Sequence, residues 1–166
     1  MSFKDISPES ISDSVFNLIG KEWMLVTAGE EVSFNTMTAA WGGFGVMWDR
    51  NICFCVIRPT RHTYGFMEKS QDFSLSFFED RYRDVLNYCG TKSGKDVDKI
   101  AGTGLTPVFD DGAIYFEEAR LVIICRKIYV QDIVPGNFLD QGIDNYYPGK
   151  DYHRMYMGEI RRCLHR

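Results

Sequence analysis

The sequence has no surplus of positive charge and no long hydrophobic run. Its 166 residues carry 19 Lys and Arg against 23 Asp and Glu, a formal net charge of −4. Contacts with a phosphate backbone need a basic surplus, so nucleic acid is not an expected partner. No apolar run approaches the roughly 20 residues that span a membrane, and Met1–Asp5 lacks the apolar core of a signal peptide. We therefore expect a cytoplasmic protein with no membrane partner.

Cysteine and histidine are few and are poorly spaced for metal binding. The five cysteines are odd in number and form no Cys-x-x-Cys pair, which argues against a disulfide framework and a zinc site. Cys53 and Cys55 share one face if their segment is a strand, and two buried small side chains explain them better than a metal does. None of the three histidines lies at metal-ligand spacing from another, so we expect no metal.

The residues that are present predict one packed domain over residues 1–166. Hydrophobic residues make up 45% of the chain and charged residues 25%, as in ordinary globular proteins. Ser7, Pro8 and the apolar spacing up to Gly20 predict a first helix. Further helices are expected at 60–69, 80–89 and 96–101, a glycine-rich corner at 42–45, and strands at 23–28, 32–40, 52–57, 73–78, 113–116, 119–133 and 154–161.

Short connections between many of these strands predict an antiparallel sheet rather than a doubly wound one. A long antiparallel sheet leaves two exposed edges unless it closes, and closure removes them. The sequence therefore predicts a mainly β fold, an antiparallel barrel with peripheral helices.

The strand at 34–41 has two unusual faces. Thr36, Thr38 and Ala40 lie on one face, and small or polar residues also interrupt the other face. Small side chains let a flat ring approach the strand, whose N–H and C=O groups can pair with the ring edge. The alternative is an edge strand whose threonines serve only β propensity.

The segment Arg58–Thr63 lies where an apolar strand meets a predicted helix that Thr60 could cap. Free helix N–H groups, a threonine hydroxyl and the guanidinium groups of Arg58 and Arg61 could converge there on one anion, such as a phosphate. The alternative is an ordinary N-cap with solvated arginines.

Two further segments carry weaker signals. The loop Cys89–Lys99 offers hydroxyl, ammonium and glycine groups that could extend a phosphate site, but it lacks the Walker spacing. His153 precedes the last strand and could donate a proton or a hydrogen bond to a substrate near neutral pH. A lone histidine is more often structural.

Four ordered motifs together resemble the flavin reductase-like family: Asn35–Trp41, Arg58–Tyr64, Cys89–Lys99 and His153–Ile160. The resemblance covers the chain from about Trp23 to Ile160, and its pattern is similar to that of the flavoredoxin-like members. It implies the FMN-binding split β-barrel fold. It also implies a homodimer that holds one non-covalent FMN per subunit near the dimer interface.

The resemblance further implies roles for single residues. It places Thr36, Met37, Thr38 and Ala39 against the isoalloxazine ring, and Arg58, Thr60 and Arg61 around the phosphate. Ser93 and Lys99 match the family's loop motif, where they would either contact the phosphate or shape the loop. His153 matches a position near the open face of the flavin, which makes it the candidate catalytic residue on the nicotinamide side.

Three functions fit these expectations. The first is an NAD(P)H-dependent flavin reductase, in which FMN passes electrons to a small-molecule flavin, a metal complex or a redox protein. The second is a flavoredoxin-type electron carrier without its own nicotinamide activity, whose acidic charge would suit a basic partner. The third is a module that stores or senses FMN.

Overall fold

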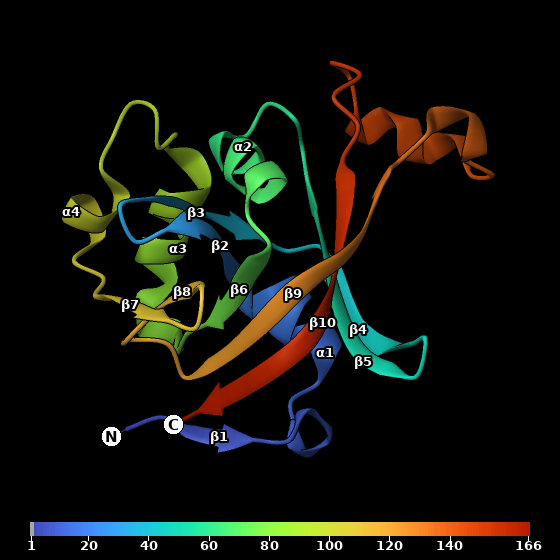
Figure 1. Ribbon diagram of the computed structural model, residues 1–166. Coiled ribbons are helices and arrows are strands. Elements are labelled where there is room, and N and C mark those ends of the chain that lie inside the picture. Colours follow the sequence, from blue (N-terminus) through green and yellow to red (C-terminus); the bar gives the residue numbers. More distant parts are fainter. Residues whose placement is uncertain (1) are drawn as a thin grey trace.

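Most of the chain folds into an antiparallel sheet, as the hydrophobic alternation predicts. The computed structural model describes residues 2–166. Its main sheet has eight strands in the order β3-β2-β6-β9-β10-β5-β4, with β1 added beside β10 (Figure 1). The strands are β1 (Lys4–Ile6), β2 (Met24–Glu30), β3 (Ser33–Ala39), β4 (Gly42–Met47), β5 (Arg50–Ile57), β6 (Asp72–Phe77), β9 (Leu121–Asp132) and β10 (Arg154–His165), while β7 (Pro107–Asp110) and β8 (Ala113–Phe116) form a separate hairpin.

The helices are short and lie around the sheet. They are η1 (Pro8–Ser10), α1 (Val15–Asn17), η2 (Leu18–Glu22), α2 (His62–Lys69), η3 (Asp80–Tyr82), α3 (Arg83–Thr91), α4 (Lys99–Thr103), η4 (Pro135–Asn137) and η5 (Gln141–Tyr146). Both α2 and α3 pack on β2 and β3. The expected antiparallel fold with peripheral helices is confirmed.

Both faces of the central strands are buried. Val26 and Ile123 point into one apolar cluster, whereas their neighbours Leu25 and Val122 point into a second cluster. Successive residues of a strand face opposite sides, so these strands need cover on both sides. Continuous apolar runs such as Leu121–Cys125 follow from this double burial.

The expected closure of the sheet is wrong. The strand order begins at β3 and ends at β4, and these two strands are not hydrogen-bonded to each other. The sheet is therefore open, and helices and Lys99 cover part of its free edge at β3.

The first predicted helix is also wrong as a single element. The chain forms a short turn of helix at Pro8–Ser10, breaks, and resumes at Val15 before ending at Glu22, beyond the predicted end at Gly20. The break contains Ser12–Ser14, and Ser and Asp side chains compete with the helix for backbone hydrogen bonds. Trp23 ends the helical stretch with a φ of 72°.

The predicted glycine-rich corner is a strand. Gly42–Met47 forms β4, which pairs with β5. The turn between them carries positive φ at both Trp48 (53°) and Asp49 (54°), the conformation of a type I′ hairpin turn. Neither residue gives the Asn-Gly signal that usually predicts such a turn, so the hairpin was not visible in the sequence.

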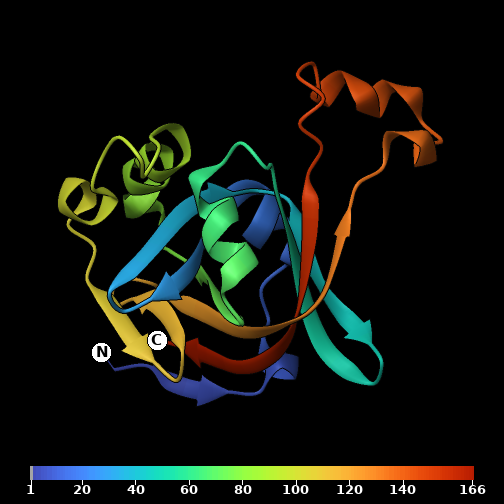
Figure 2. The ribbon, with the colours of Figure 1, turned by 45° about the horizontal axis from the view of Figure 1, so that its top comes forward.

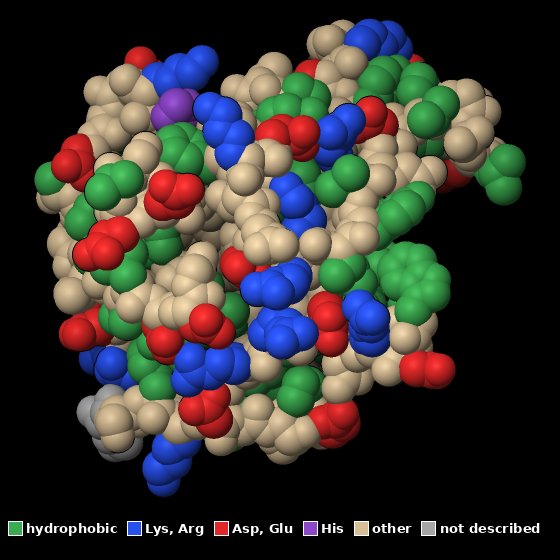
Figure 3. Space-filling view, in the orientation of Figure 1, with side chains coloured by type: hydrophobic (Ala, Val, Ile, Leu, Met, Phe, Trp, Pro, Cys, Tyr) green, Lys and Arg blue, Asp and Glu red, His purple; other side chains and the backbone are tan. Residues whose placement is uncertain are grey.

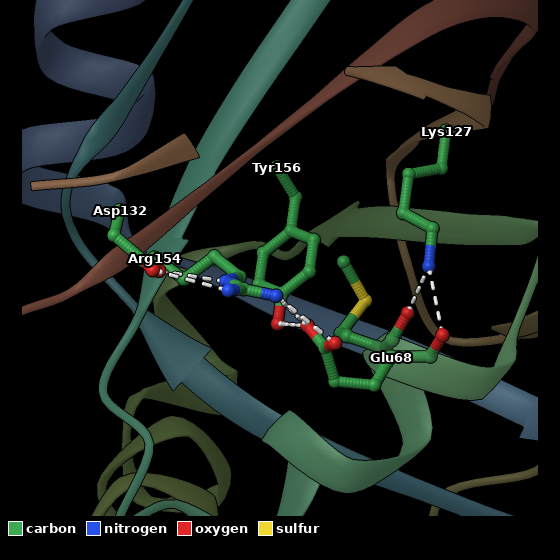
Figure 4. A network of polar contacts seen from close by, with 6 residues as sticks. Glu68, Lys127, Asp132, Arg154 and Tyr156 are labelled. Carbon is green, nitrogen blue, oxygen red and sulfur yellow. Dashed lines mark hydrogen bonds and ion pairs between the residues drawn. The ribbon is translucent and has the colours of Figure 1, made fainter. Parts of the chain in front are cut away.

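A polar network fixes the C-terminal end of α2 to the sheet (Figure 4). The carboxylate of Glu68 accepts hydrogen bonds from the Tyr156 hydroxyl at 2.5 Å and from Arg154 at 3.1 Å. Arg154 also pairs with Asp132 at 2.7 Å, and Lys127 donates to the backbone carbonyl of Glu68 at 3.2 Å. Donors from β9 and β10 therefore determine where α2 lies, and with it the helix N-terminus.

Residues 133–152, which join β9 to β10, form a lobe that projects from the sheet (Figure 2). The lobe contains η4 and η5 and an aromatic group formed by Phe138, Tyr147 and Tyr152. The ring centroids of Tyr147 and Tyr152 are 4.8 Å apart. This packing gives the irregular segment a small core of its own.

We expect Glu68→Ala to lower the free energy of unfolding by about 1–3 kcal/mol, because it leaves the Tyr156 hydroxyl without its acceptor and removes one of the two carboxylates that pair with Arg154. Urea denaturation followed by circular dichroism measures the change. The matched control is Glu117→Ala, since Glu117 is exposed and its carboxylate has no hydrogen-bond partner in the described chain. The control should change the stability by less than about 0.5 kcal/mol. Equal stabilities of the two variants would contradict the anchoring role.

Candidate functional site

The edge strand β3 is held between two helices. Asn35 donates a hydrogen bond from Nδ2 to the Thr63 hydroxyl in the first turn of α2, at 2.8 Å. Thr38 donates from its hydroxyl to the Leu86 carbonyl of α3, at 2.5 Å. Alternate side chains point to opposite faces of a strand, so each helix is bonded to a different face of β3. The two contacts fix the strand while leaving its outer edge free of strand partners.

A cavity of about 210 Å³ lies at the C-terminal half of this edge. Its lining comes from three separate parts of the chain: Met37, Thr38, Ala39, Ala40 and Trp41 from β3 and beyond, Val56, Arg58 and Arg61 around the end of β5, and His153 before β10. Six of the residues named from the sequence line it together: Met37, Thr38, Ala39, Arg58, Arg61 and His153.

Four of the named residues lie elsewhere, Lys99 among them. The Thr36 side chain is buried and its hydroxyl bonds that of Thr27 at 2.8 Å, so it points away from the cavity. Thr60 is exposed in the turn before α2, and the N-cap is Arg61 rather than Thr60. Ser93 accepts a hydrogen bond from the backbone N–H of Lys95 at 3.2 Å, so its hydroxyl shapes its own turn.

Arg61 is the cation of this site without a counter-ion. Its guanidinium is half-buried and makes no hydrogen bond or ion pair with any residue in the described chain. Burial lowers its pKa, but an arginine remains charged in a protein. Arg61 also stands at the N-terminus of α2, where the first backbone N–H groups have no partner within the helix. This combination favours an anion.

Arg58 lines the cavity and also has partners in the lobe. It donates to the Asp151 carboxylate at 2.9 Å and to the Tyr146 carbonyl at 2.8 Å. Its guanidinium also lies 4.7 Å from the centre of the Tyr147 ring. Arg58 therefore holds the lobe against the cavity, and these two bonds use two of its five N–H donors.

Lys99 lies beside the β3 edge in a neighbouring cavity of about 630 Å³ that the first half of the strand also lines. Its ammonium group donates to the carbonyls of Thr36 at 2.7 Å and Cys89 at 2.9 Å. Burial, partly offset by Cys89 and assisted by the charge of Arg61, lowers the pKa of Lys99 to about 8. Two neighbouring cations without a shared carboxylate would be stabilised by an anion placed between them.

His153 is nearly buried, and its Nδ1 lies 2.7 Å from the Tyr147 hydroxyl. Burial lowers the pKa of His153 to about 4, with a contribution from the charge of Arg58 that Asp151 partly offsets. The ring is therefore neutral at neutral pH. Of the two chemical roles expected for it, this environment disfavours proton donation and leaves hydrogen bonding.

Trp41 lines the cavity, and its role was not apparent from the sequence. Its ring lies 5.1 Å from the ring of His153, which also lines the cavity, and 5.5 Å from the Tyr146 ring of the lobe. Tyr147 contacts the site through His153. A signal was present in the dense aromatic residues around 146–153. Periodicity gave no way to connect this irregular segment with β3.

No helix in residues 2–166 is long and apolar enough to cross a membrane. Within the same residues, no cluster of three or more His, Cys, Asp or Glu side chains has an arrangement that could hold a metal ion.

Comparisons with known proteins agree on one family and one fold. The model of the flavin reductase-like domain matches residues 16–166. A search of curated protein sequences gives no match. Among solved structures, flavoredoxin from Methanosarcina acetivorans is similar with a TM-score of 0.69 and 19% identity, over 87% of this chain and 68% of that one.

Two further structures extend this result. An FMN-binding domain of a flavin reductase-like enzyme from Shewanella baltica gives a TM-score of 0.70 at 16% identity, over 98% of this chain and 76% of that one. An NADH:FAD oxidoreductase from Streptomyces globisporus gives a TM-score of 0.63 at 16% identity, over 86% and 74%. At identities this low, structural similarity shows the fold alone. The expected split-barrel architecture is confirmed.

The lowered pKa of Lys99 predicts a pH dependence of stability. The folded-state pKa is about 8 against an ordinary value of 10.5, so between these values the unfolded chain binds more protons. The free energy of unfolding of the wild type should therefore rise with pH across this window relative to Lys99→Met, which has no group to titrate. Denaturation curves at a series of pH values measure it. Lys92→Met, at an exposed lysine, should follow the wild type. A constant difference between wild type and Lys99→Met would refute the shift.

Proposed function

Because the chain belongs to the flavin reductase-like family, we propose that it binds FMN and catalyses electron transfer from NAD(P)H to a small-molecule flavin or a redox protein. The observation that carries the proposal is the meeting of two features at β3. A free strand edge lines one cavity, and the unneutralised Arg61 stands beside it at the N-terminus of α2.

The residues at the site fit the two chemical parts of FMN. The phosphate needs charged donors, which Arg61, the first N–H groups of α2 and Lys99 supply. The isoalloxazine ring needs a flat surface and backbone partners for its edge, which the cavity side of Thr38–Ala40 offers. Ser93 and Thr60 support this site through the turns that they form rather than through donors aimed into the cavity.

Bound FMN supplies hydride and single-electron chemistry, so no side chain has to provide a nucleophile or an acid. The residues of this chain then have three tasks. The β3 edge orients the ring, Arg61 and Lys99 bind the anionic end, and Trp41 limits the access of water at the other end. His153 lines the same cavity as a neutral group suited to the carboxamide of a nicotinamide.

We also propose that the working form is a homodimer in which the partner completes the site. The cavity of about 210 Å³ is smaller than the roughly 300–1,000 Å³ of most ligand sites. Exposed apolar side chains gather at the β4–β5 hairpin, where Val46 is 73% and Trp48 59% exposed, and Figure 3 shows hydrophobic surface there. Such a patch on a folded chain commonly marks a protein interface.

The phosphate assignment predicts that Arg61→Gln weakens FMN binding by about 10- to 100-fold, the effect of losing one or more charged hydrogen bonds. Quenching of FMN fluorescence during titration gives the dissociation constant. Arg81→Gln is the matched control. Arg81 lies in η3, is exposed, pairs with Glu79 and does not line the cavity. An unchanged affinity in Arg61→Gln would remove this residue from the phosphate site.

The reductase activity predicts that NADH or NADPH bleaches the flavin absorbance of the FMN-loaded protein under anaerobic conditions. The rate should rise with nucleotide concentration and saturate. Bleaching only by an added redox protein would assign the chain to electron carriage instead. A protein that does not take up FMN would overturn the proposed function as a whole.

A further inference from the structure

Tyr147 and His153 form a buried contact at the point where the lobe meets the cavity. Tyr147 is 3% and His153 8% exposed, and the hydroxyl oxygen of Tyr147 lies 2.7 Å from Nδ1 of His153. A neutral imidazole carries its proton on one nitrogen only, so this contact has two forms. Either the hydroxyl donates to Nδ1, or Nδ1–H donates to the hydroxyl oxygen.

The surroundings favour the first form. Burial raises the pKa of Tyr147, so the phenol keeps its proton at neutral pH. That buried hydroxyl hydrogen needs an acceptor. In the described chain Nδ1 is the one acceptor that the hydroxyl contacts. If Nδ1 carried the proton, a buried hydroxyl hydrogen would lose its partner, which is unfavourable.

The other ring nitrogen of His153 is available at the cavity. Nε2 makes no hydrogen bond in the described chain. The one fully buried side-chain polar atom without a partner in that part of the chain is Ser76 Oγ, so Nε2 is not fully buried. It therefore reaches a surface, and His153 lines the cavity together with the β3 edge. With Nδ1 acting as an acceptor, Nε2 carries the proton and points a donor to this surface.

Burial, with a contribution from the charge of Arg58, keeps the His153 ring neutral. Arg58 lowers the pKa of His153 and Asp151 raises it, and these two groups are bonded to each other. Tyr147 donates to Nδ1 from the lobe. From β3 the ring meets the uncharged Trp41, and Arg61 adds a second positive charge to the cavity wall.

We infer that Tyr147 is a positioning residue that holds His153 in its Nε2–H form, so that the ring presents a neutral hydrogen-bond donor to a carbonyl oxygen of the molecule lying over the flavin. The second part of this inference rests on the proposed function. A neutral N–H donor suits a carboxamide or ketone oxygen, and it does not act as a proton source at neutral pH.

The lobe keeps Tyr147 itself in place. Arg58 lies 4.7 Å over its ring, and Phe138 stacks nearly parallel to it with 15° between the ring planes. Tyr152 packs against it from the same lobe, and donates from its own hydroxyl to Asp144 at 2.6 Å. The orientation of His153 therefore depends on residues far along the chain from β3.

The test is NMR of the flavin-free full chain labelled with ¹⁵N-histidine, because two-bond proton–nitrogen spectra distinguish a protonated from an unprotonated ring nitrogen. His153→Asn assigns the signal among the three histidines of the chain. We expect His153 in the Nε2–H form at neutral pH. In Tyr147→Phe we expect a mixture of both forms and a pKa of His153 raised by about one pH unit, since a donor that stabilises the neutral ring is gone.

Tyr152→Phe is the matched control, because its hydroxyl bonds Asp144 and does not touch His153. It should leave both the ring form and the pKa of His153 unchanged. His153 in the Nδ1–H form in the wild type, or an unchanged His153 in Tyr147→Phe, would overturn the inference whatever the chain does with FMN. Added FMN should then shift the His153 signals of the wild type. The expected ring form without any such shift would overturn the link to the flavin and count against the proposed function.

Discussion

The free edge of β3 is the constraint on which the site depends. A strand at the end of an open sheet has one row of backbone N–H and C=O groups without strand partners, and such groups must find other partners or remain in contact with solvent. At Thr36 the carbonyl is taken by Lys99, which draws α4 and its loop over the first half of the strand. Further along, beside Thr38 and Ala39, the edge opens into the cavity. Covered and open parts of one strand edge thus define where a flat ligand can lie.

The sequence predicts the parts of this site that local patterns encode. The alternation around Thr38 marks β3, and the apolar run that ends before Arg58 marks β5 and the helix after it. Contacts between residues that are distant in the sequence could not be predicted in this way. Whether an arginine is free or engaged depends on contacts such as that of Arg58 with Asp151, 93 residues away, and no local pattern carries that information. Arg61, by contrast, has no counter-ion in the described chain, and the sequence did not indicate this difference between the two arginines.

The same limit explains the errors in the fold. Three glycines in 42–45 predict a corner, yet pairing with β5 makes the segment a strand, because tertiary contacts override local propensity. The expected closure of the sheet followed from a general preference for covered edges. Here α3, α4 and Lys99 cover part of β3, so a second way of managing an edge replaced the expected one.

Arg58 couples the two halves of the site in a way that follows from its bonds. Its guanidinium holds the lobe through Asp151 and the Tyr146 carbonyl. These bonds tie the end of β5 to a segment that follows β9, so the position of the lobe beside the cavity depends on a residue in the turn before α2. A substitution of Arg58 therefore removes a cavity-lining cation and the anchor of the lobe together, whereas a substitution of Arg61 removes a cavity-lining cation alone.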